Sequence, residues 1–285
     1  MSRVSGVFEK AAAHRRGVLI GYLPAGFPSV KCAIRAATAM AEAGADIVEI
    51  GLPYSDPLMD GPVIQEAVHR ALVGGTRVAD VLSTTSAVAA AGVPVLVMTY
   101  WNPIDRYGVD AFARDLAAAG GAGVITPDLT PEEGGPWLEA AARHGLDPVF
   151  LVAPSSTDER IAKVTSMCGG FVYAASVMGV TGARDSVGEA AAGLVARVRA
   201  RTTLPVAVGL GVRDGAQAAR VAEFADGVIV GSAFVHCLLS APDEDAGVAA
   251  VGRLAAELSS GVRSAQRYGA QYAGRYDAPT GGDRR

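Results

Sequence analysis

Short apolar segments recur along this chain, and each is followed by a longer, alanine-rich stretch with helical periodicity. Eight such segments can be counted, at residues 17–23, 45–51, 93–100, 122–128, 147–153, 170–176, 204–211 and 225–233. They are rich in branched apolar residues and lack polar alternation, which is typical of strands buried on both faces of a parallel sheet. Eight strand–helix alternations in 285 residues predict an α/β protein with a closed (βα)8 TIM barrel.

A doubly wound open sheet is the alternative fold, and it requires a GxGxxG turn after the first strand. Here the first apolar segment continues instead into LPAGFPS (23–29). The later GLGVRDG (209–215) has a different glycine spacing and follows the seventh segment. The sequence therefore favours the barrel.

The stretches between the strands carry helix-boundary signals. Residues 29–45 begin with Ser29, a good N-cap, and contain Gly44, a residue suited to follow the last helical turn. We expect a second helix from Pro131 to Gly145 and a third over residues 214–227.

Two segments lie outside the alternation. Residues 5–16 are expected to form an extra helix that plugs the floor of the barrel, and residues 244–272 the final helix. We expect one domain over residues 1–274 and a disordered tail at 275–285, where the chain becomes polar and rich in glycine.

Composition argues against several classes of protein. Only 19% of the residues are charged and the formal net charge is −4, so no basic surplus indicates nucleic-acid binding. No run of about eighteen apolar residues suggests a membrane span, and the first residues lack the apolar core of a signal peptide. Cys32, Cys168 and Cys237 are far apart and form no CxxC pair, which favours a reducing compartment. We expect a cytoplasmic protein.

The segment VEIGLPYSDPLMDGPVIQ (48–65) places a carboxylate inside a buried strand. Strand alternation puts Ile47 and Glu49 on one face, and Glu49 lies near the C-terminal end of the strand, where barrel enzymes bind their substrates. If that face is the barrel interior, desolvation raises the pKa of Glu49 and suits it to proton transfer near neutral pH. A structural ion pair is the alternative, although no basic residue lies beside this stretch.

The loop after this strand carries two more carboxylates, Asp56 and Asp60. Asp60 can accept a hydrogen bond from a substrate N–H and balance positive charge that develops there. Asp56 can do the same or can face a partner protein, and spacing alone does not rank the two.

Glycines at the ends of the seventh and eighth segments predict a phosphate site. Gly209 and Gly211 lie at the end of one segment and Gly231 near the end of the other, and the loops at these two places often bind phosphate in barrels. Ser232 adds a hydroxyl group at an expected helix start. Each glycine taken singly is better explained as a tight-turn residue, and the pairing of the two loops favours phosphate.

Other chemistries lack the residues they need. The four histidines form no HxxxH pair and do not end a strand, there is no GxSxG motif, and no lysine stands at a strand end. We therefore expect no metal and no covalent intermediate. The glycine-rich loop GVTGARDS (179–186) can close over a substrate, or can be an ordinary surface turn.

These residues resemble the tryptophan synthase alpha chain family. The stretches VEIGLPYSDPLMDGPVIQ (48–65) and GVTGAR (179–184) are the most specific, and GYLPAGFP (21–28) and MTYWNP (98–103) lie where the family has its own versions. The resemblance extends from about Val7 to Tyr268, nearly the whole chain.

The resemblance implies a barrel enzyme that splits indole-3-glycerol phosphate into indole and glyceraldehyde 3-phosphate, in the last steps of tryptophan biosynthesis. It implies that Glu49 is the proton shuttle and that Asp60 is the second catalytic carboxylate. The implied substrate-binding residues are Thr181, Gly182, Gly211, Gly231 and Ser232 in the loops that carry the phosphate site, and Tyr100, Ile125 and Tyr173 in the indole pocket.

The family works with a beta chain, which carries pyridoxal phosphate and receives the indole. The resemblance therefore implies an α2β2 heterotetramer, no cofactor on this chain, and a partner surface that includes Pro53, Asp56, Pro57 and Asn102. A stand-alone lyase that releases indole, a catalytically idle regulatory subunit and another phosphate-binding barrel enzyme remain alternatives.

Overall fold

The chain forms one parallel sheet. The computed structural model describes residues 2–176, 184–209 and 211–265. Within them the strands are β1 (Val18–Pro24), β2 (Ile47–Gly51), β3 (Val95–Met98), β4 (Gly123–Ile125), β5 (Asp147–Val149), β6 (Leu151–Val152), β7 (Val172–Ala175), β8 (Val206–Gly209) and β9 (Gly227–Val230). Their order in the sheet is β5-β4-β3-β2-β1-β9-β8-β7-β6, so strands that follow one another in sequence are also neighbours in space.

The sheet closes into a barrel because β5 and β6 are two parts of one strand, interrupted at Phe150. On one side, the N–H of Thr126 donates to the carbonyl of Val149 over 3.2 Å. On the other side, the N–H of Tyr173 in β7 donates to the carbonyl of Phe150 over 3.2 Å. Residues 147–152 thus join the two ends of the sheet. The predicted (βα)8 barrel is confirmed, and its fifth strand is divided once.

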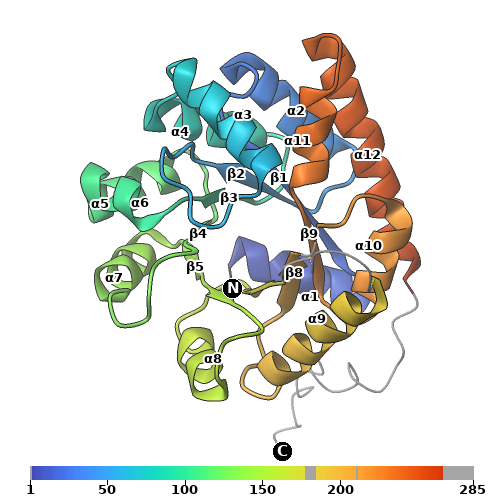
Figure 1. The fold of residues 1–285 in the computed structure, drawn as a ribbon. Helices are drawn as coiled ribbons and strands as arrows, with labels where there is room; N and C mark the ends of the chain where they lie inside the picture. Colours follow the sequence, from blue (N-terminus) through green and yellow to red (C-terminus); the bar gives the residue numbers. More distant parts are fainter. Residues whose placement is uncertain (1, 177–183, 210, 266–285) are drawn as a thin grey trace, which may run out of the picture.

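Helices pack around the strands, and those other than α1 lie on the outside, as Figure 1 shows. In the described residues they are α1 (Arg3–Ala13), α2 (Val30–Glu42), α3 (Pro62–Val73), α4 (Val78–Ala89), α5 (Trp101–Tyr107), α6 (Val109–Ala118), α7 (Gly135–His144), α8 (Asp158–Thr165), α9 (Arg184–Arg199), α10 (Gly215–Ala222), α11 (Ser232–Leu239) and α12 (Glu244–Ser264). None of these described helices is long and apolar enough to cross a membrane.

Helix boundaries follow the expected caps in part. The hydroxyl of Ser29 accepts the N–H of Cys32, so α2 begins where predicted. The helix predicted from Pro131 begins only at Gly135, because residues 131–133 form a turn in which the N–H of Glu133 donates to the carbonyl of Thr130.

The ends of two helices also differ from the prediction. α10 ends at Ala222, because the chain must turn before Gly227, which is the first residue of β9. The last helix ends at Ser264 rather than at residue 272, because Ala265 adopts an extended backbone with ψ of 124°. The tail predicted at 275–285 lies outside the described residues.

The first helix, α1, plugs one end of the barrel, as predicted, although it spans Arg3–Ala13 rather than residues 5–16. Its Phe8 packs against Phe171 with the ring centroids 5.5 Å apart. In Figure 1 α1 lies within the ring of outer helices. The cluster inside the barrel combines residues of α1 with inward-facing residues of the strands: Val4, Phe8, Ala11, Val18, Ile20, Ile47, Leu96, Ala122, Ile125, Val149, Phe171, Ala207 and Ile229.

Candidate active site

Glu49 faces the interior of the barrel at the C-terminal end of β2. Ile47, two residues earlier, belongs to the cluster inside the barrel, whereas Val48 and Ile50 pack toward the helices. Glu49 is 1% exposed, and no described residue forms a hydrogen bond with its Oε2. Burial, and then the negative charge of Asp60, raise the pKa of Glu49 to about 8. A large part of the Glu49 side chains therefore carry a proton at neutral pH.

Asp60 lies close to Glu49 on the loop that follows β2, and Tyr100 holds that loop in place. The Tyr100 hydroxyl accepts hydrogen bonds from the backbone N–H groups of Leu58 and Met59, over 3.0 and 3.1 Å. Burial raises the pKa of Asp60, and a hydrogen bond from Tyr100 opposes that rise. The side chains of Glu49, Asp60 and Tyr100 therefore form one electrostatic group.

The structure distinguishes Asp56 from Asp60, which the sequence could not rank as candidates to contact substrate. Asp56 is exposed, and its Oδ2 accepts the Ser55 hydroxyl over 2.6 Å. Asp60 is half-buried and interacts electrically with Glu49. Asp60 is consequently the better candidate for a group that contacts substrate.

Two more tyrosines complete the mouth of the barrel. Tyr173 extends from β7, and burial is the main cause that raises its pKa, followed by the charges of Glu49 and Asp60. Tyr22 on β1 is opposite Glu49 in the register of the two strands. The sequence did not point to Tyr22, although it lies two residues beyond the inward-facing Ile20, the same step that separates Glu49 from Ile47.

Two residues at the end of β4 have different roles. Ile125 is fully buried and belongs to the cluster inside the barrel, beneath the candidate site. Asp128 points elsewhere: its two carboxylate oxygens accept the N–H of Trp101 over 2.9 and 3.1 Å. That carboxylate caps the start of α5, and the pKa of Tyr100 is raised chiefly by burial and also by the Asp128 charge.

The structure describes some residues of the expected phosphate site and not others. Gly231 is the N-cap of α11 and Ser232 is its first residue, so the unpaired N–H groups of the first helical turn lie there. Gly211 has a positive φ of 69°, which favours glycine on backbone grounds. Gly209 serves another purpose, because a Cβ at that position would lie 2.6 Å from the Tyr173 hydroxyl. Thr181 and Gly182 lie outside the described residues.

The surface expected to face a partner lies on the loop after β2 and, at Asn102, on α5. Asp56 and Asn102 are exposed and Pro57 is half-buried, whereas Pro53 is buried and shapes the loop from within. The loop also exposes two apolar side chains that the sequence had not singled out: Leu58 is 76% exposed and Met59 is 47% exposed.

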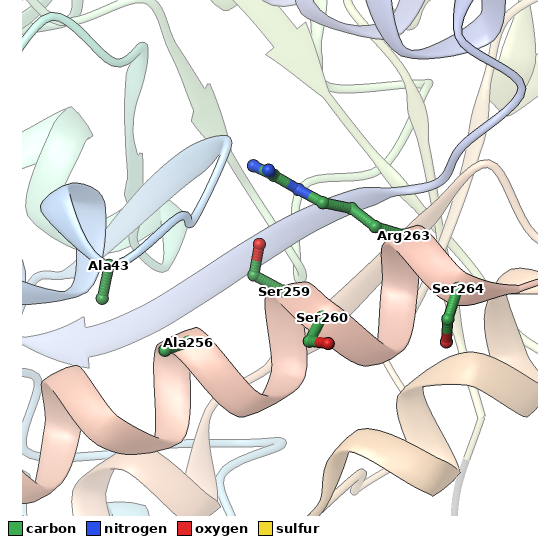
Figure 2. A pocket seen from close by; sticks show the side chains of 6 residues that line it. All are labelled: Ala43, Ala256, Ser259, Ser260, Arg263 and Ser264. Atoms are coloured by element: carbon green, nitrogen blue, oxygen red, sulfur yellow. The ribbon is translucent and has the colours of Figure 1, made fainter.

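A cavity of about 520 Å³ opens on the outside of the barrel, between α12 and the end of α2. Figure 2 shows serines 259, 260 and 264 and Arg263 along one helix, with Ala43 on the facing segment. Ala43 precedes β2, so this cavity is near the N-terminal end of that strand, whereas Glu49 is near the C-terminal end. The cavity is therefore separate from the candidate site.

Comparison with known proteins identifies the family. The family model described as tryptophan synthase alpha chain matches residues 8–263. This chain belongs to the tryptophan synthase alpha chain family. The tryptophan synthase alpha chain of Salinispora arenicola is 61% identical over 264 residues, which are 93% of this chain and 99% of that relative. The alpha chain of Thermobifida fusca is 59% identical over 261 residues, 90% of this chain and 97% of its own length.

Solved structures agree with membership in the tryptophan synthase alpha chain family. A chain in a structure of Mycobacterium tuberculosis tryptophan synthase has a TM-score of 0.86 and 56% identity, over 92% of this chain and 99% of that chain. Tryptophan synthase subunit alpha of Legionella pneumophila has a TM-score of 0.84 at 33% identity, over 92% of this chain and 98% of that one. Another kind of phosphate-binding barrel enzyme is therefore not favoured.

Proposed function

We propose that this chain cleaves indole-3-glycerol phosphate into indole and glyceraldehyde 3-phosphate, the alpha reaction of tryptophan synthase. One observation supports this most strongly: Glu49 is fully buried at the mouth of the barrel, with its pKa raised to about 8 and Asp60 beside it. Family membership indicates the substrate, and this pair of carboxyl groups matches the acid–base chemistry that the substrate needs.

The reaction is a retro-aldol cleavage between indole C3 and the side chain. C3 first takes up a proton and the ring becomes an electron-poor indolenine. The side-chain hydroxyl next to the ring then loses its proton, the carbon–carbon bond breaks, and its electrons return to the ring as the aldehyde forms. Protonated Glu49 donates the first proton, and the carboxylate that results accepts the second. Glu49 thereby returns to its starting state with no net change in protons.

Asp60 stabilises the positive charge that the ring acquires. When C3 is protonated, the ring N–H becomes strongly acidic and electron-poor. The carboxylate of Asp60 accepts a hydrogen bond from it, an interaction that strengthens as the charge develops. Tyr100 supports this ionised form, because its hydrogen bond opposes the rise in the Asp60 pKa that burial causes.

The remaining site residues bind and orient the substrate. The phosphate lies at the start of α11, against Gly211, Gly231 and Ser232, and Thr181 and Gly182 also belong to the proposed substrate-binding residues. Tyr100 and Tyr173 lie beside the indole ring, and Ile125 lies beneath it. Binding energy at the phosphate, far from the bond that breaks, is then available to orient the reacting end.

The chain works with a tryptophan synthase beta chain, in an α2β2 heterotetramer. Asp56, Pro57 and Asn102 contribute to the partner surface, and the buried Pro53 shapes its loop. The beta chain receives the indole and carries the pyridoxal phosphate, and this chain needs no cofactor of its own. We place the complex in the cytoplasm, since the three free cysteines do not form disulfides.

A turnover assay on indole-3-glycerol phosphate tests the proposed function. Because general acid–base catalysis contributes about a hundredfold or more, Glu49→Gln should lower kcat by at least about a hundredfold. Asp60→Asn should lower kcat as well, because the amide cannot balance the ring charge. Both variants should keep the circular-dichroism spectrum of the unaltered chain. A Glu49→Gln enzyme with kcat within about tenfold of the unaltered chain would contradict the assignment.

The same assay with and without the beta chain tests the partnership. We expect low activity for the isolated chain and a strong increase when the beta chain is added, because contact with the 53–61 loop orders the group around Asp60. Efficient release of indole by the isolated chain, unchanged by the beta chain, would favour the stand-alone lyase instead.

A further inference from the structure

Tyr22 lies between the two ends of the proposed substrate site, the phosphate end at Gly231 and the acid–base end at Glu49 and Asp60. It lies on β1, which pairs with β2 on one side and β9 on the other (Figure 1). Its side chain is 6% exposed. Two glycines flank it: Gly51 ends β2, and Gly231 follows β9 at the start of α11.

The ring of Tyr22 fills the space that these glycines leave. A Cβ added to Gly231 would lie 3.2 Å from Cδ1 of Tyr22 and 3.5 Å from its Cβ. A Cβ added to Gly51 would lie 2.7 Å from both Cε2 and Cζ and would collide with the hydroxyl. Neither glycine has a positive φ, so the backbone does not require them. The need for space around Tyr22 is the physical reason for glycine at position 51, whereas a Cβ at Gly231 would make a tight contact with the same ring.

The side chain therefore runs from the proposed phosphate end to the acid–base end. The Cβ and Cδ1 atoms of Tyr22 lie against Gly231, where the phosphate is placed. The Tyr22 hydroxyl lies against Gly51, where the loop to Asp60 begins. With the phosphate at Gly231 and the indole ring near Asp60, as the proposed function places them, a three-carbon chain between the two passes along this side chain. The Tyr22 hydroxyl then stands beside the carbons that carry the substrate's own hydroxyl groups.

The Tyr22 hydroxyl is a hydrogen-bond donor at this point. Burial raises its pKa well above 10, and the charges of Asp60 and Glu49 raise it further, so the proton stays on the oxygen. Among the described residues, none forms a hydrogen bond with this hydroxyl. Tyr100 differs, because its oxygen already accepts two backbone N–H groups.

We propose that the Tyr22 hydroxyl donates a hydrogen bond to a hydroxyl oxygen on the side chain of the substrate, and that Tyr22 thereby determines specificity for a hydroxylated three-carbon chain. The inference rests on the proposed function, because it assumes an indole ring and a phosphate at the two ends. It adds a residue that recognises the portion of the substrate between them.

Two ligands and one conservative variant test the proposal. Indole-3-propanol phosphate has the same ring, chain length and phosphate as the substrate but lacks the two side-chain hydroxyls. Dissociation constants for both ligands are measured by calorimetry on the full chain in a Glu49→Gln background, which prevents turnover. Because a neutral hydrogen bond contributes modestly, Tyr22→Phe should weaken binding of indole-3-glycerol phosphate by about three- to tenfold. Its affinity for indole-3-propanol phosphate should stay the same.

Other variants make the result decisive. Tyr107→Phe removes an exposed hydroxyl that bonds to Asp115, and it should change neither affinity. Gly51→Ala forces the Tyr22 ring aside, and it should reduce the preference for the hydroxylated ligand in the same direction. Equal affinities of Tyr22→Phe and the Glu49→Gln parent for indole-3-glycerol phosphate, or an equal loss for both ligands, would overturn the role of the Tyr22 hydroxyl. If the parent itself bound neither ligand, the proposed function would fail instead.

Discussion

The buried Glu49 carboxyl is unfavourable for folding at neutral and alkaline pH. Its folded-state pKa of about 8 lies above the ordinary value of 4.5, chiefly because burial disfavours the charged form. Below about pH 4.5 the side chain is protonated in both the folded and the unfolded chain. As the pH rises from 4.5 towards 8, the unfolded chain releases the proton first, so the free energy of unfolding falls.

Glu49→Gln should therefore stabilise the protein in a pH-dependent way. We expect almost no difference near pH 4.5 and a gain in the free energy of unfolding of about 4 to 5 kcal/mol near pH 8.5, because glutamine cannot ionise. Urea unfolding across this pH range measures it. The control is Glu42→Gln, an exposed position where the change should stay within about 0.5 kcal/mol. A Glu49→Gln gain that did not vary with pH would contradict the raised pKa.

At the scale of elements, α1 closes the floor beneath the reacting groups. Val4, Phe8 and Ala11 of this helix are all buried and belong to the same cluster as the inward-facing strand residues. The helix is anchored at its start by Ser2, whose hydroxyl accepts the N–H of Ser5. The apolar floor and the polar mouth divide the barrel interior into two layers.

Truncating the floor should destabilise the barrel without removing a reacting group. Phe8→Ala should lower the free energy of unfolding by about 3 to 5 kcal/mol, because it leaves a cavity against Phe171. Lys10→Ala, on the exposed side of α1, should cost less than about 0.5 kcal/mol. Chemical denaturation of both variants measures the difference. A Phe8→Ala cost below about 1 kcal/mol would show that α1 does not seal the barrel.

At the scale of the whole molecule, the same loop carries a reacting carboxylate and an exposed apolar surface. Leu58 and Met59 donate their backbone N–H groups to Tyr100, while their side chains remain 76% and 47% exposed. Exposed apolar side chains beside a functional site are characteristic of protein–protein contacts. Contact with the beta chain at Leu58 would therefore act directly on the loop that positions Asp60.

Leu58→Asp should weaken binding to the beta chain by at least about tenfold, because a charge would enter an apolar contact. The stability of the isolated chain should change little, since the side chain is exposed. Val73→Asp is the matched control: Val73 is 75% exposed and lies at the far end of α3. Calorimetric titration of each variant with the beta chain measures the two affinities. Equal binding by the two variants would place the interface elsewhere.

Most of the architecture could be predicted because its causes are local. Buried strands show as apolar segments, and caps such as Ser29 mark helix starts. The two-residue period of a strand was enough to place Glu49 on the same face as Ile47. The division of the fifth strand at Phe150 was not predictable, since it depends on hydrogen bonds to strands before and after it. The late start of α7 at Gly135 was also missed, because proline and glycine signals conflict in that stretch.

By itself, the sequence determined the alternating fold, the shared face of Ile47 and Glu49 and the resemblance to the family, whereas the structure showed that this face is the barrel interior. Only the tertiary structure placed Asp60, rather than Asp56, beside Glu49, and set Tyr22 opposite Glu49 in the strand register. Only the structure showed that Gly209 makes room for Tyr173 and that Gly51 makes room for Tyr22. The physical reason is that strand pairing and close packing join residues distant in sequence, whereas periodicity and capping depend on neighbours along the chain.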